Sequence, residues 1–458
     1  MKNVYTVFKS LFLSLIVVCI LNSCLGGLQA DQKETVSKPN IIFIMADDLG
    51  YHDLGSYSQT NILTPNIDKL AAEGLKFTNV YAGSTVCAPS RSVLITGKHT
   101  GNTTVRGNFS KVDGLVEGNR VPLFDHDTTV AEVLKQAGYV TGITGKWGLG
   151  EPGSTGVPTR QGFDEWFGYL NQQHAHSYYP EYLWKNEEKQ VLEGNVNGDR
   201  NTYSHHLFTE FALDFIDKHA DTTFFLYLPY TVPHAKYEIP DTQPYTDKPW
   251  PENAKVHAAM ITLLDRDVGK IMEKLKAKGI DNNTIVFFCS DNGAALKWDG
   301  IFDSSGILRG KKRDMYEGGL RTPMIGWMPG VVPQGKVSDR PWYFADVLPT
   351  LAQIAQTNSP ADIDGISVWP TLLGQDQNTA DRFMYWEFHE RGYQQAARWN
   401  HWKAVKLAPD QEIELYDLSV DPGELFNVAQ LNPDMVKKMV TYLKSARSHS
   451  DFWPIKFE

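Results

Sequence analysis

The sequence predicts an α/β protein in which a large mixed, mostly parallel sheet is sandwiched by helices and followed by a smaller C-terminal α+β subdomain. Up to about residue 375, short apolar runs alternate with segments of helical periodicity, the pattern of a parallel sheet covered on both faces. After that point, closely spaced strand-like runs are followed by one closing helix. We therefore expect a large domain at 39–375 and a subdomain at 376–458.

Each element of the large domain follows from a local pattern. The first strand is an apolar, β-branched run that ends in two aspartates. The first helix opens at Thr64-Pro65, because Thr is a suitable N-cap and Pro suits the first turn, and Gly74 stops it. The expected strands are 40–45, 140–144, 224–228 and 285–290, and the expected helices are 65–73, 128–137, 204–219 and 253–278.

The C-terminal subdomain is expected to be antiparallel. Its strand-like runs cover 383–388, 396–407 and 412–418, and a helix near 433–446 closes the chain. No internal repeat or low-complexity tract interrupts the sequence.

Composition excludes several classes of protein. The chain has 458 residues with 44 Lys and Arg against 54 Asp and Glu, a formal net charge of −10, which argues against a nucleic-acid partner. Its four cysteines are too few for a disulfide scaffold, and none are spaced as CxxC, which argues against a zinc ribbon.

The N-terminus predicts export. A basic start and a short apolar stretch end at Leu21-Asn22-Ser23-Cys24, which resembles a bacterial lipobox. This implies a lipoprotein signal peptide at 1–23, a possible lipid on Cys24, and a linker at 24–38. Cleavage after the run at 26–30, or an uncleaved anchor, are the alternatives. We expect the periplasm or the outer membrane of a Gram-negative bacterium, with membrane contact only through the lipid.

The segment Cys87–Gly97 (CAPSRSVLITG) carries the strongest functional signal. Pro89 suits the first turn of a helix, and a helix N-terminus at Cys87 would favour negative charge there. The segment resembles the signature of the sulfatase family, C-x-P-S-R followed by x-x-L-[LI]-T-G. The resemblance implies an alkaline phosphatase-like fold, a catalytic domain at 39–375, and oxidation of Cys87 to formylglycine (3-oxoalanine) by a formylglycine-generating or sulfatase-maturating enzyme. A buried structural cysteine is the alternative for Cys87 taken alone.

Two corners after expected strands resemble the metal-binding segments of that family. They are Ala46–Tyr51, with Asp47 and Asp48, and Ser290–Gly293, with Asp291 and Asn292. Three carboxylates and an amide form an oxygen-rich site typical of Ca²⁺. The resemblance implies that Asp47, Asp48, Asp291 and Asn292 hold the ion and that the modified Cys87 completes its shell.

Further segments resemble the sulfate-binding motifs of the family. By that resemblance Lys146, His234 and Lys312 contact the sulfate, Arg91 points back at residue 87 from one helical turn away, and the cationic loop with Arg309 contributes to binding. His234 is expected to protonate the leaving group. Taken singly, a Lys is usually a solvated charge and a His usually structural.

One position departs from the family pattern. Where G-K-W-H-L-G is common, this chain has Gly148 in place of the histidine. His174 and His176, in a nearby aromatic loop, are candidates to replace it or to contact the leaving group. Packing of both against the aromatic side chains is the alternative.

The expected function is a sulfuric ester hydrolase that removes sulfate from a sulfated sugar, acting from the chain end on galactose or N-acetylgalactosamine sulfates of a host or algal glycan. The alternatives are a phosphonate or phosphodiester hydrolase of the same superfamily, and a glycan-binding lipoprotein without activity. A two-metal phosphatase is disfavoured, because the sequence shows no second metal set.

Overall fold

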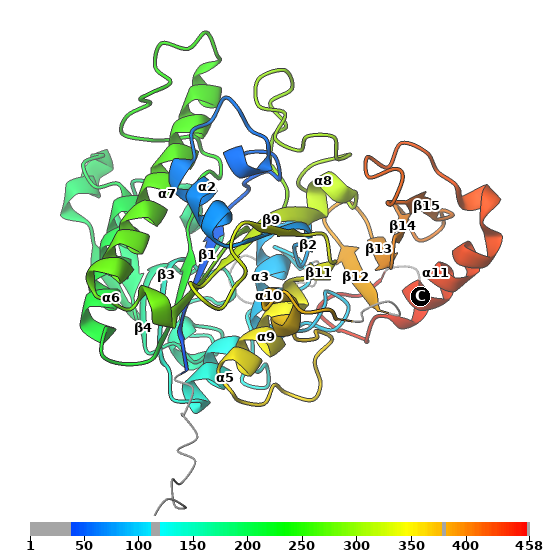
Figure 1. Ribbon diagram of the computed structural model, residues 1–458, viewed down its shortest axis with the longest axis horizontal. Coiled ribbons are helices and arrows are strands. Elements are labelled where there is room, and N and C mark those ends of the chain that lie inside the picture. The colour runs from blue at the N-terminus through cyan, green and yellow to red at the C-terminus, as the bar shows by residue number, and fades with distance from the viewer. Residues whose placement is uncertain (1–37, 111–119, 378–381, 456–458) are drawn as a thin grey trace, which may run out of the picture. The chain divides into compact units, whose positions relative to one another are not determined.

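The computed structural model describes residues 38–110, 120–377 and 382–455. The signal peptide, Cys24 and nearly all of the linker predicted at the N-terminus lie outside these ranges. Two sheets with their covering helices make up the described chain (Figure 1).

The large sheet has eleven strands in the order β10-β2-β9-β8-β1-β7-β3-β4-β5-β6, with β11 also paired to β2. Its central strands β8, β1, β7, β3 and β4 are parallel, whereas β9, β5 and β6 join antiparallel. The strands are β1 Asn40–Ala46, β2 Leu75–Tyr81, β3 Val140–Lys146, β4 Glu165–Tyr169, β5 Tyr182–Lys185, β6 Glu188–Val191, β7 Phe224–Pro229, β8 Thr284–Ser290, β9 Arg321–Trp327, β10 Lys336–Ser338 and β11 Trp342–Tyr343. The mixed, mostly parallel sheet expected from the sequence is confirmed.

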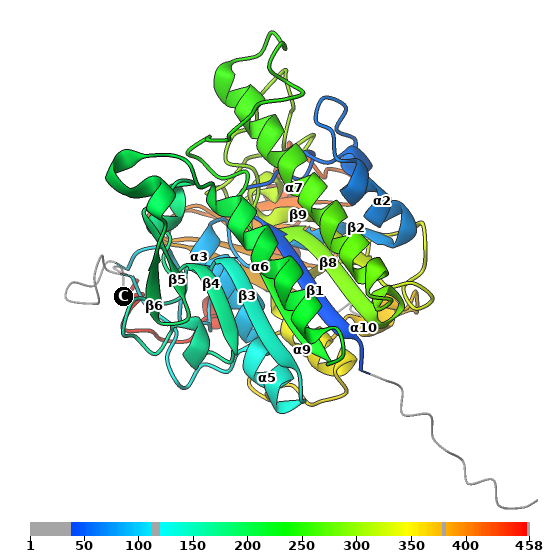
Figure 2. The same ribbon diagram turned by 90° about the vertical axis from the view of Figure 1, so that its left-hand side faces the viewer.

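Helices cover both faces of this sheet, and each face has its own apolar core. Figure 2 shows α6 and α7 lying across one face, while α3, α5 and α9 pack on the other. The helices are α2 Pro65–Glu73, α3 Cys87–Thr96, α5 Val130–Gln136, α6 Ser204–His219, α7 Glu252–Ala277, α8 Glu317–Leu320, α9 Val347–Ile354, α10 Trp369–Leu372 and α11 Pro433–Ser445. Within the described residues, none of these helices combines the length and apolar composition needed to cross a bilayer.

Local sequence signals explain where several helices begin. In α5, Thr129 accepts from the backbone N–H of Glu132, whose carboxylate accepts from the N–H of Thr129, a reciprocal cap that starts the helix two residues later than expected. In α2, Pro65 occupies the first position as expected, but the Thr64 side chain does not cap the helix. Its hydroxyl instead contacts Asp68 and the N–H of Gly55.

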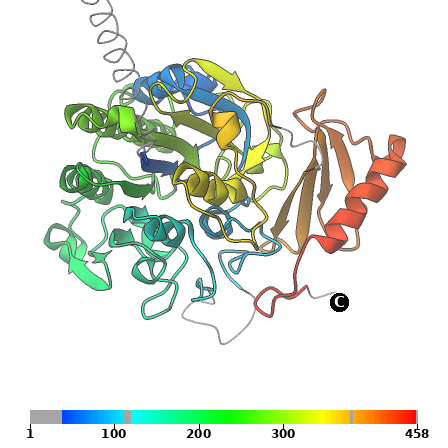
Figure 3. The same ribbon diagram turned by 60° about the horizontal axis from the view of Figure 1, so that its bottom comes forward.

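The smaller sheet is antiparallel, in the order β12-β13-β14-β15, with α11 packed on its outer side (Figure 3). Its strands are β12 Phe383–Phe388, β13 Gln394–Trp399, β14 Trp402–Lys406 and β15 Glu414–Asp417. The single strand predicted over 396–407 is wrong. Asn400 adopts φ 54°, a left-handed conformation that asparagine tolerates, and turns the chain into the β13–β14 hairpin.

Candidate active site

The site forms where β1, β8, β3 and β7 end together. Ala46 pairs with Ser290 in the parallel β1–β8 ladder, so the segments that follow, with Asp47 and Asp291, emerge side by side. The N–H of Asp291 donates to Ala46 O at 3.0 Å, and the N–H of Asp48 donates to Asp291 Oδ1 at 3.1 Å. Adjacent parallel strands therefore deliver the predicted acidic corners to one point.

Helix α3 brings Cys87 to the same point. All ten of its residues are buried, and Cys87 is the first. The Ser90 hydroxyl donates to Asp291 O and accepts from the N–H of Gly83, which fixes the first turn against the end of β8. Cys87 Sγ lies 3.4 Å from both Asp47 Oδ1 and Lys312 Nζ, and burial raises the pKa of this thiol to about 12.

Three cations are paired with the three carboxylates. Lys146 Nζ donates to Asp47 Oδ2 at 2.7 Å, and Lys312 Nζ donates to both Asp48 oxygens at 2.6 and 2.7 Å. Arg91 Nη2 lies 2.8 Å from Asp291 Oδ2 and 3.5 Å from Asp47 Oδ2. We call this the central cluster: Asp47, Asp48, Cys87, Arg91, Lys146, His234, Asp291, Asn292 and Lys312.

The pKa values of the carboxyl groups differ within the central cluster. Burial opposes ionisation of Asp47, but Lys146, His234, Arg91 and Lys312 outweigh it and hold its pKa well below the usual value. For Asp291, burial and the negative charge of Asp47 dominate and raise its pKa to about 6. The neighbouring cations thus outweigh the cost of burying the charge of Asp47, but they only partly offset that cost for Asp291.

Two features of the cluster fit a metal ion. The side-chain N–H of Asn292 donates to Asp48 Oδ1 at 2.7 Å, whereas its Oδ1 is buried with no hydrogen-bond partner among the described residues. Ligand atoms of Asp47, Asp48, Cys87 and His234 all lie within 4.8 Å of one another. An unpaired buried oxygen beside carboxylates suits a hard dication, which would also favour the ionised form of Asp291.

The histidines occupy different places. His234 Nε2 lies 3.5 Å from Asp48 Oδ2, and burial lowers its pKa to about 4. The His176 ring stacks on His234, with centroids 4.8 Å apart and planes at 15°. His174 packs between Tyr169 and Tyr182, at 5.0 and 4.4 Å, and has no partner for its buried Nδ1 among the described side chains. Of the two candidates in the aromatic loop, His176 contacts the central cluster through His234, whereas His174 packs against tyrosines.

Arg309 lies apart from the other predicted site residues. Its guanidinium lies 3.8 Å from the Tyr316 ring centroid, and Nη1 donates to Tyr416 Oη at 2.8 Å and to Glu424 O at 3.1 Å. The hydrogen bonds of the Arg309 side chain are thus made with the C-terminal subdomain, and its ring contact is made with Tyr316 of the large domain.

Several residues near the site carry no sequence signal of their own. Tyr178 Oη donates to both Thr231 O and His234 O, which fixes the loop that holds His234. Gln172 is buried, and its Nε2 has no partner among the described residues. A Cβ at position 148 would lie 2.1 Å from that nitrogen, so the Gln172 amide occupies the space beside Gly148. In the sequence, the glycine at position 148 in place of the family histidine was the one signal that pointed to this contact between Gly148 and Gln172.

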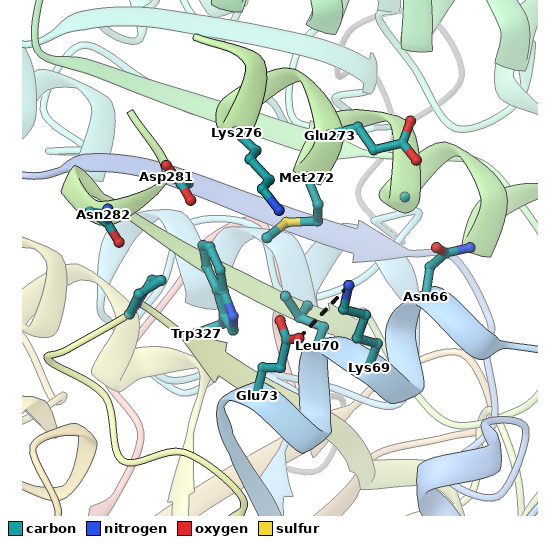
Figure 4. A pocket seen from close by; sticks show the side chains of 12 residues that line it. Asn66, Lys69, Leu70, Glu73, Met272, Glu273, Lys276, Asp281, Asn282 and Trp327 are labelled. Atoms are coloured by element: carbon teal, nitrogen blue, oxygen red, sulfur yellow. Dashed lines mark ion pairs between the residues drawn. The ribbon is translucent and has the colours of Figure 1, made fainter. Parts of the chain in front are cut away.

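A cavity of about 490 Å³ lies elsewhere, between α2 and α7 (Figure 4). Lys69 and Glu73 of α2 face Glu273 and Lys276 of α7 across it, with Trp327 at one end. Asp281 and Asn282, which also line it, precede β8, whereas Asp291 follows that strand. The cavity therefore lies at the start of β8, whereas the central cluster lies at the end of that strand.

Comparison with known proteins agrees with this geometry. The sequence model of the sulfatase family matches residues 39–357, and that of the N-sulphoglucosamine sulphohydrolase C-terminal region matches residues 310–449. A curated N-acetylgalactosamine-6-O-sulfatase of Bacteroides thetaiotaomicron is 30% identical over 513 residues, covering 94% of this chain and 97% of that protein. The N-acetylgalactosamine-6-sulfatase of Canis lupus familiaris is 34% identical over 371 residues, covering 76% of this chain and 68% of that protein.

A solved structure extends the likeness to the fold. Ps i-CgsB, in complex with k-i-k-neocarrahexaose, has a TM-score of 0.79 at 28% identity, covering 92% of this chain and 96% of that chain. The signature at Cys87, the two acidic corners and the matched family therefore agree, and the chain belongs to the sulfatase family of sulfuric ester hydrolases.

Proposed function

We propose that this enzyme removes sulfate from a sulfated sugar, using a formylglycine made from Cys87 and a bound Ca²⁺. The observation that carries the proposal is the convergence on Cys87: its sulfur lies 3.4 Å from both a carboxylate oxygen and Lys312 Nζ, in a buried cluster. A thiol with a pKa raised to about 12 is a poor nucleophile at neutral pH. Chemical conversion of Cys87 would remove that obstacle.

The oxygen atoms fit the ion. Asp47, Asp48, Asp291 and the unpaired Asn292 Oδ1 would hold it, together with an oxygen of the converted residue 87. The ion would lower the pKa of a hydroxyl at position 87 and offset charge on the sulfuryl oxygens. One hydroxyl of the hydrated aldehyde would bond to sulfur while the bond from sulfur to the sugar oxygen breaks. Deprotonation of the second hydroxyl would then re-form the aldehyde and break its bond to sulfate.

The charges of the cluster suit an anionic ester. Asp47, Asp48 and Asp291 are balanced by Arg91, Lys146 and Lys312. A dication would leave the site positive, which favours a sulfate ester and its doubly charged product. Lys146 and Lys312 would bind the outer sulfate oxygens, and Arg91 would keep Asp291 and Asp47 in place.

The stacked imidazoles would handle the leaving group. Burial lowers the pKa of His234 to about 4, and the negative charge of a bound ester would raise it again. We propose that His234 passes a proton to the departing sugar oxygen, with His176 fixing its ring plane. His176 would then act through His234, a different role from that of the histidine missing at position 148.

Half-buried aromatic rings near the cluster would bind the sugar. Tyr237 lies three residues beyond His234, and its ring centroid is 5.5 Å from that of Trp298. Such rings commonly line ligand pockets. The names of two relatives support N-acetylgalactosamine 6-sulfate as the substrate. We propose an N-acetylgalactosamine or galactose sulfate, with action at the chain end.

The deciding experiment is sulfate release from a panel of defined sulfated mono- and disaccharides. We expect turnover of galactose or N-acetylgalactosamine sulfates and no release from Cys87→Ala. An aryl sulfate and an aryl phosphodiester assayed side by side test the phosphodiesterase alternative. The mass of the peptide carrying residue 87 separates an aldehyde from an unmodified thiol, and a thiol throughout would favour a binding protein.

We also propose that the protein is exported and lipidated on Cys24. The lipobox-like sequence before that residue supports this. In cells, Cys24→Ser should move the protein from the membrane fraction to the soluble fraction. An unchanged distribution would contradict lipidation.

A further inference from the structure

A buried ionic group joins the C-terminal sheet to the loop that carries Lys312. Lys403, on β14, lies 3.0 Å from Glu317 Oε1 and 2.8 Å from Glu424 Oε1, and none of the three is exposed to solvent. Tyr81 Oη donates to the second oxygen of Glu317 at 2.7 Å. We call Glu317, Lys403 and Glu424 the junction cluster.

The junction cluster holds the short helix α8. Glu317 is its first residue, and the N–H of Glu317 donates to Glu424 Oε2 at 2.6 Å. The same helix contacts the acidic corner at Ser290–Gly293, because the N–H of Gly293 donates to Gly319 O at 3.1 Å. A Cβ at Gly293 would lie 1.9 Å from Gly318 O, so the two backbones are in direct contact beside Asn292.

The loop before α8, which carries Lys312, also contacts the C-terminal subdomain. The N–H of Lys312 donates to Ala294 O at 2.9 Å, which sets the start of its side chain. On one flank Arg309 donates to Glu424 O, and on the other Arg313 pairs with Glu390 of the C-terminal subdomain at 3.2 Å. The side chains on both flanks of Lys312 are therefore anchored to that subdomain, whereas its own backbone is anchored to the large domain.

Burying this group is costly, and the cost suggests a role beyond stability. An isolated buried ion pair is often no more stabilising than apolar side chains of the same volume. A charged group fixes one geometry, however, because any displacement leaves a carboxylate or an ammonium unpaired.

We propose that Lys403, with Glu317 and Glu424, is a positioning residue for sulfate ester hydrolysis. It holds α8 and thereby fixes Lys312 and Asn292 at the central cluster. Part of the catalytic geometry is thus set by the C-terminal subdomain. The inference rests on the proposed function for its kinetic readout, but binding of inorganic sulfate provides one that needs no turnover.

The test is the double variant Lys403→Met with Glu424→Gln, measured with a sulfated sugar and with inorganic sulfate. We expect kcat/KM to fall about tenfold or more and sulfate to bind correspondingly more weakly, as when a partner of an active-site group is removed. Glu424→Gln alone, which keeps an acceptor for the N–H of Glu317, should give a smaller loss in the same direction. The Glu424→Gln variant provides the test if the double variant does not fold.

The matched control is Arg447→Met. Arg447 also pairs with a fully buried carboxylate of the C-terminal sheet, Glu387, at 3.1 Å, but within the described residues no hydrogen bond or ion pair joins it to the Lys312 loop. It should lower the unfolding temperature while kcat/KM and sulfate binding stay within about twofold. Unchanged sulfate binding in folded junction variants, or an equal loss in the control, would overturn the proposal. Wild-type protein that binds sulfate but releases none from the panel would instead count against the proposed function.

Discussion

The central cluster and the junction cluster are both groups of buried charges, at two ends of one loop, yet they differ in what they leave open. In the junction, each carboxylate faces Lys403 and the group is fully enclosed. In the central cluster, Asn292 Oδ1 has no partner among the described residues, and the His234 side chain keeps 12% of its surface exposed. Buried charge alone therefore does not mark a reactive site. The central cluster differs in combining an unpaired ligand oxygen on Asn292 with a histidine that reaches solvent, whereas no member of the junction cluster is exposed.

The largest effect should come from Cys87. Cys87→Ala removes the residue that becomes the nucleophile, and we expect sulfate release to fall by at least about 10⁴-fold. The control is Cys289→Ala, because Cys289 is the other buried free cysteine among the described residues but packs inside β8. It should lose about 1 kcal/mol of stability and little turnover. Comparable turnover in both variants would contradict the mechanism.

The cations of the central cluster should come next. Lys312→Met leaves Asp48 without its main cation, and we expect kcat to fall about 10²- to 10³-fold. Lys311→Met, one residue earlier, should stay within about twofold. Steady-state kinetics on one sulfated sugar measure both. Equal losses would mean that loop folding, and not the charge at residue 312, is what matters.

The two histidines sharpen the comparison at the edge of the central cluster. His176→Ala should lower kcat about tenfold, because it removes the ring stacked on His234. His174→Ala should leave kcat within about twofold, because that ring packs against Tyr169 and Tyr182. Kinetics on the preferred sugar test the pair. A loss confined to His174→Ala would reverse the assignment.

The smallest effect concerns stability at the junction. Burial, and then the charge of Glu317, raise the pKa of Glu424 to about 7 despite Lys403, against about 4.5 in an unfolded chain. Between these values the folded protein keeps a proton that the unfolded chain has released, so this group makes stability fall as pH rises. Glu424→Gln should flatten that part of the curve, measured by urea unfolding between pH 4.5 and 7.5. Parallel curves would show that Glu424 does not titrate there.

Sequence patterns predicted those parts of the fold that local chemistry decides. The amphipathic helix over 204–219 has the bounds expected, as does the strand over 383–388, because apolar periodicity fixes both. Strand β9, Arg321–Trp327, was missed because a proline interrupts it and the motif before it looks like loop. The hairpin at Asn400 was missed because the apolar run continues on both sides of the turn.

The site shows the same limit. Cys87, the acidic corners and the cations were found because each lies in a short motif, and β1, β8 and α3 bring them together. Arg309 was assigned to substrate binding only because it lies in the same cationic loop as Lys312, and its side chain turns toward Tyr416 and Glu424. Lys403 and Glu317 are 86 positions apart, and no local sequence pattern predicts their contact.

The arrangement at Gly148 has a consequence for engineering and for divergence within the family. Gly148 has φ 82°, and a side chain there would collide with the Gln172 amide. Restoring the histidine common in the family therefore requires the Gln172 side chain to move or to be replaced by a smaller one, and a changed backbone at 148. A side chain introduced at position 148 is therefore expected to be tolerated better together with a smaller residue at position 172 than alone.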